Sequence, residues 1–175
     1  IGFYGNDVVV GTSTADQMYG DYGWGTNTAN GNDFLDAGAG DDSVWGQGGD
    51  DTINGGTGND TIFGDGIYSL TDGNDVIFGG TGNDTIDGGG GSDVALFTGN
   101  QTSYTITWDA GNSRYNVVGA DGTDTVKDVE YLVFEDEVLT LDNTGSFSTT
   151  AAGSYASGRL AVGTSGIDSL TLANT

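Results

Sequence analysis

Residues 55–63 read Gly55-Gly56-Thr57-Gly58-Asn59-Asp60-Thr61-Ile62-Phe63, and residues 79–87 repeat them as Gly79-Gly80-Thr81-Gly82-Asn83-Asp84-Thr85-Ile86-Asp87. In both copies an aspartate closes a glycine-rich turn, and an isoleucine follows it two positions later. Self-similarity at a fixed period indicates a repeat architecture, which has to be recognised before individual strands are assigned.

The same unit recurs throughout the first 97 residues. The turns end at Asp7, Asp16, Asp33, Asp42, Asp51, Asp60, Asp75, Asp84 and Asp93. Six of the eight intervals are nine residues, and the other two, of 17 and 15, are nine plus an insertion. The residues two positions after these aspartates are Val9, Met18, Leu35, Val44, Ile53, Ile62, Ile77, Ile86 and Ala95. This pattern predicts a turn and a minimal strand in each unit, with one apolar side chain pointing inward.

Composition excludes several functions. The 175 residues include 34 Gly, 26 acidic and only three basic residues, with a net charge of −23 and neither His nor Cys. The first basic residue is Arg114, so binding to nucleic acid or to an anionic membrane surface is disfavoured. Without His or Cys the chain has no zinc or haem ligand, nucleophile–His pair or disulfide. The remaining oxygen ligands suit calcium.

The nonapeptide follows the pattern G-G-x-G-x-D-x-U-x, and residues 1–97 therefore resemble the RTX (repeats-in-toxin, haemolysin-type calcium-binding) family. The resemblance implies an all-β fold, a right-handed parallel β-roll in which two nonapeptides complete one coil. It also implies that calcium ions lie between turns stacked on the same edge. A small β C-terminal cap is expected to follow.

Two repeats per coil sort the turns onto two edges. Edge A has the turns ending at Asp7, Asp33, Asp51, Asp75 and Asp93, and edge B has those ending at Asp16, Asp42, Asp60 and Asp84. Counting gaps predicts about seven Ca²⁺ ions, within an expected range of five to eight. The occupancy of the irregular turns at Asp16, Asp33, Asp75 and Asp168 is left open. By resemblance, the metal-binding residues are Asp7, Asp33, Gly38, Gly40, Asp42, Gly46, Gly48, Asp51, Gly55, Thr57, Asp60, Asp75, Gly79, Thr81, Asp84, Gly88, Gly90 and Asp93.

The repeats alone bury too little apolar surface to fold. Each buries roughly one side chain, for about 1.5–3 kcal/mol, whereas ordering a backbone costs about 1–2 kcal/mol per residue. The first 97 residues also hold 16 aspartates and no cation, so that they repel one another. Bound calcium is expected to supply the missing stability.

The C-terminal part is less regular. Residues 98–142 are expected to form the cap, with strands at 104–108 and 115–118 joined by a turn. Residues 121–136 resemble a stretch that follows the repeats in many secreted RTX proteins, and Asp121 and Asp124 are weaker candidate calcium ligands. Residues 143–162 are predicted to be a linker, and 163–175 the start of a further repeat.

Two surface features allow other functions. Tyr19, Trp45 and Phe63 are predicted to form an outward aromatic stripe, which either packs against the chain's own C-terminal segment or a neighbouring domain, or binds carbohydrate or protein. The pairs Thr57/Asn59 and Thr81/Asn83 resemble ice-binding ladders, but only two rungs match. The edge-A insertions are a further candidate surface.

The sequence therefore predicts a calcium-binding, non-catalytic module of a secreted or cell-surface bacterial protein, folding on extracellular calcium. The family resemblance implies export by type I secretion. We expect the chain to be a segment of a longer protein, with flanking domains that hold any catalytic centre. The alternatives are an adhesin, surface-layer or self-associating assembly unit, or an accessory domain of a secreted protease, lipase or polysaccharide-modifying enzyme.

Overall fold

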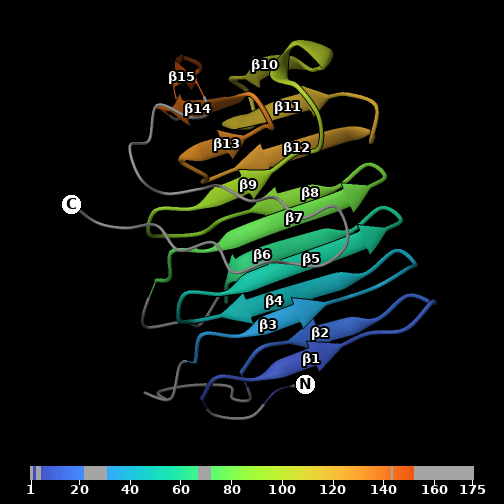
Figure 1. The fold of residues 1–175 in the computed structure, drawn as a ribbon. Coiled ribbons are helices and arrows are strands. Elements are labelled where there is room, and N and C mark those ends of the chain that lie inside the picture. Colours follow the sequence, from blue (N-terminus) through green and yellow to red (C-terminus); the bar gives the residue numbers. More distant parts are fainter. Residues whose placement is uncertain (1, 3–4, 22–30, 67–71, 143, 152–175) are drawn as a thin grey trace.

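The computed structural model describes residues 2, 5–21, 31–66, 72–142 and 144–151. These residues form two facing sheets that build a roll, with a wider cap across one end (Figure 1). The two predicted edge-A insertions fall in the turns 20–33 and 64–75, of which 22–30 and 67–71 lie outside the described residues. The predicted repeat at 163–175 also lies outside them.

All the described strands belong to two sheets. The first sheet has the order β1 (Val8–Val10), β3 (Phe34–Asp36), β5 (Thr52–Thr57), β7 (Val76–Thr81), β9 (Val94–Leu96), β13 (Tyr131–Val133), β14 (Glu137–Leu141) and β15 (Phe147–Ala151). The second has the order β10 (Thr105–Asp109), β11 (Arg114–Val118), β12 (Thr123–Lys127), β8 (Thr85–Asp87), β6 (Thr61–Asp65), β4 (Ser43–Gln47) and β2 (Gln17–Tyr19). Strands β1 to β9 alternate between the two sheets along the chain, whereas β10 to β12 all lie in the second sheet and β13 to β15 in the first. The alternation of β1 to β9 confirms the prediction of two nonapeptides per coil.

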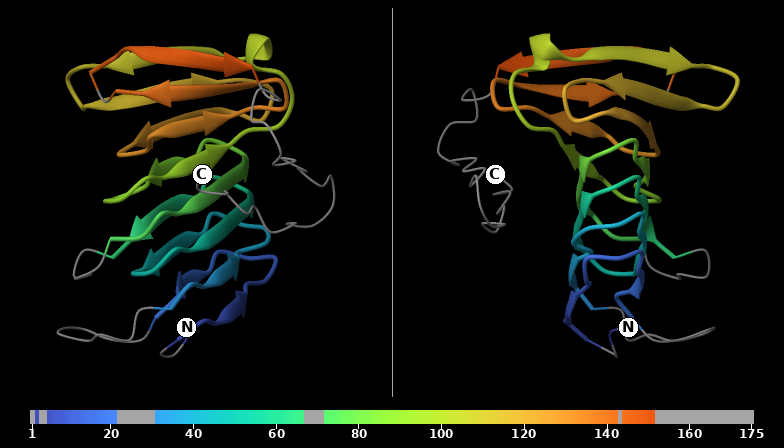
Figure 2. Two further views of the ribbon diagram at one scale, coloured as in Figure 1. Left: turned by 60° about the vertical axis from the view of Figure 1, so that its left-hand side comes forward. Right: turned by 90° about the vertical axis from the view of Figure 1, so that its right-hand side faces the viewer.

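Parallel pairing keeps equivalent repeat positions level with each other. Ile53 pairs with Ile77 between β5 and β7, and Ile62 pairs with Ile86 between β6 and β8. The two sheets face each other as narrow parallel layers (Figure 2). The predicted inward residues from Met18 to Ala95 are all buried, and only Val9, at the open end, is half-buried.

The cap continues the roll before it closes it. Strand β12 pairs in parallel with β8, and β13 pairs in parallel with β9. Antiparallel strands then flank them: β10 and β11 beside β12, and β14 and β15 beside β13. The predicted hairpin strands are therefore present, shifted by up to one residue.

One segment differs from the sequence interpretation. Residues 147–151, inside the predicted linker, form β15 and pair with β14 in register from Leu141–Phe147 to Glu137–Ala151. A Ser- and Thr-rich composition is typical of linkers, but Thr also favours strands when a neighbouring strand edge is free to pair.

The core makes a direct prediction. Ile62→Ala should lower the free energy of unfolding in excess calcium by about 2–5 kcal/mol, because it leaves a cavity between the sheets. Thr61→Ala, one residue away on the half-buried outer side, is the matched control and should change it by less than about 0.5 kcal/mol. Denaturant unfolding measures both, and equal effects would contradict the assigned core.

Candidate calcium sites

Each repeat aspartate after the first on its edge accepts a hydrogen bond from the preceding turn. On edge A the backbone N–H groups of Asp7, Asp33, Asp51 and Asp75 donate to Oδ1 of the next aspartate at 2.7–2.8 Å. On edge B those of Asp16, Asp42 and Asp60 do the same at 2.7–2.9 Å. The result is one carboxylate ladder along each edge.

In most repeats the second carboxylate oxygen of the aspartate has no partner within the described part of the chain. Among the described residues, seven repeat aspartates have a buried Oδ2 without a hydrogen bond. They are Asp33, Asp51, Asp75 and Asp93 on edge A, and Asp42, Asp60 and Asp84 on edge B. A buried carboxylate oxygen without a donor is costly, so each of these atoms is suited to bind a cation.

Carbonyl oxygens lie beside these unpartnered atoms. A Cβ on Gly46 would overlap both Asp51 Oδ2 and the carbonyl oxygen of Gly64, the first residue of the next turn. The same arrangement recurs at Gly55, which faces Asp60 Oδ2 and the carbonyl of Gly79, and at Gly64. Carboxylate and carbonyl oxygens converging in a flexible turn are the donor set that calcium prefers.

The ions would depend heavily on backbone ligands. Within the described part of the chain, no three acidic side chains are grouped so that they could hold a metal ion by themselves. Calcium takes six to eight oxygen ligands, so the carbonyls exposed by the glycine turns would have to supply most of them. Bound calcium would neutralise the carboxylates and bridge consecutive turns.

The predicted ligands fall into distinct positions in each turn. Gly46, Gly55, Gly79 and Gly88 each face the Oδ2 of their own turn's aspartate. Thr57 and Thr81 lie level with each other across β5 and β7. Gly90 donates its N–H to Asp65 Oδ2 at 2.8 Å, while Gly48 contributes a buried position in the turn that ends at Asp51.

Gly38 and Gly40 occupy different positions from the other predicted glycines. The bridge between Ala39 and Thr57 places Ala37 and Ala39 where other turns have Gly55 and Thr57. Gly38 and Gly40 instead have φ values of +98° and +127°, a left-handed backbone that suits glycine. Glycine at these two positions allows the turn to adopt this backbone shape, and their metal binding through the backbone stays a prediction.

The irregular turn at Asp16 satisfies its own carboxylate. Asp16 Oδ2 accepts hydrogen bonds from the Thr12 backbone N–H at 2.7 Å and from its hydroxyl at 2.8 Å. Thr12 therefore takes the place that the neighbouring turns leave for a cation.

Two ladder residues come from the cap: Asp124, which the sequence predicted only as a weaker candidate calcium ligand, and Glu130, which was not predicted. Asp84 N–H donates to Asp124 Oδ1 at 2.8 Å, and Asp93 N–H donates to Glu130 Oε2 at 2.7 Å. Gly119, Gly122, Asp124 and Val126 match positions 1, 4, 6 and 8 of the nonapeptide, but the β10–β11 hairpin interrupts the period before them. Glu130 follows no repeat signal at all.

Stacking of successive coils also aligns the aromatic stripe and the Asn side chains on the surface. Tyr19 and Trp45 rings stack at 4.8 Å between centroids, and Trp45 and Phe63 at 5.7 Å, so the predicted stripe exists and is half-buried. Asn59 Oδ1 accepts the N–H of Asn83, and Asp41 Oδ1 accepts that of Asn59. The Asn side chains of the ice-binding alternative therefore tie turns together.

Burial controls the charge of the ladder when no metal is bound. It raises the pKa of Asp51 to about 9 and that of Asp75 to about 8, opposed by the N–H donated to each and reinforced by neighbouring aspartates. The pKa of Asp93 rises to about 7, and those of Asp33 and Asp60 to about 6, also mainly through burial.

These geometries define a calcium-stacked parallel β-roll. The chain matches the family described as RTX calcium-binding nonapeptide repeat (4 copies), over residues 1–24, 27–66 and 67–95. It belongs to that family, and its repeats bind calcium in a β-roll. Among the described residues no helix is long and apolar enough to cross a membrane.

A solved structure supports the fold. The extracellular lipase LipA from Serratia marcescens is similar with a TM-score of 0.50 and 20% sequence identity. The match covers 61% of this chain and 18% of the lipase chain, so the likeness concerns only the β-roll fold. No curated protein matches the sequence.

The position-1 glycines lead to a prediction about occupancy. Gly46→Ala should remove at least one calcium ion per chain, because its methyl group would occupy the space between Asp51 Oδ2 and the Gly64 carbonyl. Gly111→Ala is the control: in the cap, a Cβ there meets only Asp109 Oδ1, at 3.4 Å. Equilibrium dialysis with metal analysis measures the difference, and an unchanged ion count in Gly46→Ala would contradict the site.

The raised pKa values predict how the metal-free chain responds to pH. Because folding raises the pKa of these carboxyls, their contribution to stability is complete below the unfolded value of about 3.9. It is lost as pH rises through about 6 to about 9. Circular dichroism in EDTA should therefore show less β structure at pH 9 than at pH 4. In excess calcium the trend should reverse, because protons compete with the metal; a β signal in EDTA that grows with pH would refute this.

Proposed function

We propose that this chain is a non-catalytic module of a secreted or surface protein, and that extracellular calcium switches it from unfolded to folded. The observation that carries the proposal is the set of seven buried, unpartnered Oδ2 atoms. Burying these carboxylates without a counter-ion is unfavourable, so the folded state is unstable until a cation binds.

The charge balance supports calcium as the switch. The described salt bridges pair Arg114 with Asp109, and Lys127 with Asp87 and Asp128, and no ladder aspartate takes part in them. The cations within the described part of the chain therefore leave the ladders uncompensated. Seven divalent ions would cancel 14 of the 16 negative charges in the first 97 residues.

Mass action supports a response at extracellular concentrations. Extracellular calcium modules have dissociation constants of about 10⁻⁴–10⁻³ M. An ion that binds only the folded chain, at ten times its dissociation constant, adds about 1.4 kcal/mol per site. When several sites fill together, their summed stabilisation would make folding a cooperative transition. In the calcium-poor cytosol the chain would stay unfolded and ready for export.

The residue inventory supports the absence of catalysis. The chain has no His and no Cys, so the usual nucleophile–base pairs cannot form. Seven of the ladder aspartates have Oδ1 hydrogen-bonded to the backbone and a buried Oδ2 that would face a cation, so these carboxylates are not free for acid–base chemistry. Any catalytic centre of the parent protein would lie in its other domains.

A calcium titration tests the proposed switch. Circular dichroism of the chain should show little β structure in EDTA at neutral pH and a cooperative gain as calcium rises toward the millimolar range. Magnesium at equal concentration is the control and should give a much weaker response, because it requires tight octahedral geometry and sheds water reluctantly. A fully formed β signal in excess EDTA at neutral pH would sink the proposal.

A further inference from the structure

The turn formed by residues 119–124 continues edge B beyond the matched repeats, which end at residue 95. Asp84 donates its N–H to Asp124 Oδ1, as Asp60 does to Asp84 Oδ1. Gly82 donates its N–H to the Asp121 carbonyl at 2.7 Å, as Gly58 does to the Thr81 carbonyl at 2.8 Å. The cap therefore supplies a structural repeat that faces the turn ending at Asp84.

This junction has an unpartnered carboxylate but lacks one carbonyl. Asp84 is 2% exposed, and its Oδ2 is buried without a hydrogen bond. One turn earlier, the Gly79 carbonyl lies next to Asp60 Oδ2. At Gly79 the three atoms nearest to the place that a Cβ would take all belong to Asp84, so the carbonyl of Gly119 does not approach in the same way.

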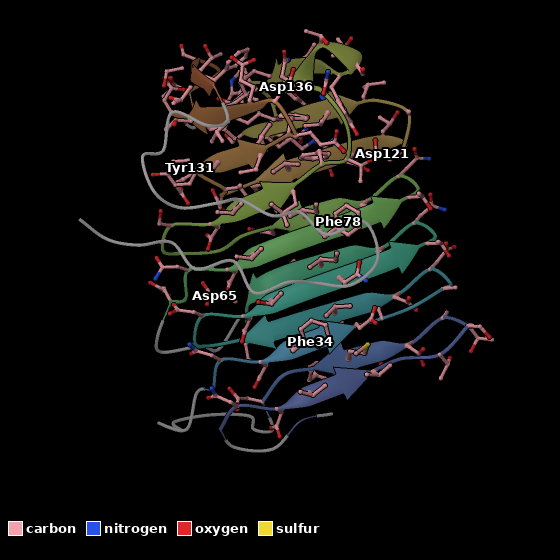
Figure 3. The ribbon with its side chains drawn as sticks, viewed as in Figure 1. Phe34, Asp65, Phe78, Asp121, Tyr131 and Asp136 are labelled. Atoms are coloured by element: carbon pink, nitrogen blue, oxygen red, sulfur yellow. The ribbon has the colours of Figure 1, made fainter. Side chains whose placement is uncertain are left out.

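A side-chain carboxylate is available instead. Asp121 occupies the turn position that Thr57 and Thr81 hold in the repeats, and its Oδ1 is buried without a hydrogen bond. Figure 3 shows Asp121 at the edge of the roll, where the chain enters β12.

Tyr104 fixes the orientation of Asp121. Its hydroxyl lies 2.6 Å from Asp121 Oδ2 and 2.6 Å from the Thr98 carbonyl oxygen, and it donates to one of them at a time. The ring is buried against Phe97 and Phe134, with centroids at 5.6 and 5.0 Å. The cap's aromatic core therefore holds Asp121 with Oδ2 bonded and Oδ1 free.

We propose that a calcium ion binds between the roll and the cap, with Asp84 Oδ2 and Asp121 Oδ1 as ligands and Tyr104 as a positioning residue. This inference rests on the proposed calcium binding of the ladders and adds a site outside the matched repeats. It couples the docking of the cap to metal binding, because one ligand comes from each part.

Ion counts of the full chain at saturating calcium test the site. Asp121→Asn preserves the shape of the side chain and should bind one ion fewer than the unmodified chain. Asp41→Asn removes the same charge from edge B, at the turn position where the next two turns have Asn59 and Asn83, and should bind the full number. Equal counts and equal calcium midpoints for Asp121→Asn and Asp41→Asn would overturn the proposal.

A second pair of variants covers the case in which Asp121→Asn does not fold. Tyr104→Phe keeps both carboxylates and removes only the hydroxyl, and it should raise the calcium midpoint of folding by about tenfold. Tyr115→Phe removes a similar bond, from its hydroxyl to the Ser146 carbonyl at 2.9 Å, and should leave the midpoint within about twofold. Equal midpoints for these two variants would refute the role of Tyr104 and with it the site.

The two proposals fail in distinguishable ways. If the unmodified chain binds no calcium, both are overturned. If it folds with calcium, and Asp121→Asn and Tyr104→Phe behave like their controls, only the site at the cap is overturned.

Discussion

The structure depends on the way each repeat divides the two oxygens of its aspartate. Oδ1 accepts an N–H from the preceding turn, as Asp51 Oδ1 does from Asp33, and this bond sets the spacing of the coils. Oδ2 of the same residue is buried without a partner. The first oxygen supports the fold without metal, and the second makes the fold unfavourable until a cation arrives. One side chain therefore provides both the register of the roll and its dependence on calcium.

The glycine turns follow from this division. A side chain at Gly46 or Gly64 would collide with the carboxylate and carbonyl oxygens that face the ion, so position 1 favours glycine for lack of space. At Gly56 and Gly80 a φ of +102° adds a second constraint, because it requires a left-handed backbone; a Cβ there would also overlap a carbonyl oxygen of the preceding turn. Two independent constraints thus keep the turns rich in glycine, whereas the inward positions need only an aliphatic side chain. The core is thin because the turns take up most of each repeat.

The sequence was sufficient to predict the features that recur at fixed positions in each nonapeptide. The nine-residue period was sufficient to predict the inward residues and the ladder aspartates from Asp7 to Asp93, because each of these depends on a fixed position within the unit. The two edges followed from the family resemblance, which implies two repeats per coil. The period could not place Asp124, since the β10–β11 hairpin separates it from the preceding turn, or Glu130, which reaches Asp93 through a longer side chain from a turn that follows no repeat pattern. Strand β15 was missed because its pairing depends on the free edge of β14 rather than on its own composition.

The missed residues show that the two ends of the ladder are not equivalent. Every ladder bond runs from an N–H to the carboxylate of the following turn, so the last turn on each edge has an N–H with no repeat left to accept it. Asp124 and Glu130 accept those two N–H groups, which would otherwise be buried without partners. At the opposite end of edge B, the Asp16 carboxylate has no preceding turn to accept from, and Thr12 donates hydrogen bonds to it instead. Because the ladder hydrogen bonds all run in one direction, the roll needs acidic acceptors at its C-terminal end and hydrogen-bond donors at its N-terminal end. The cap therefore completes the hydrogen bonding of the repeats and also covers their core.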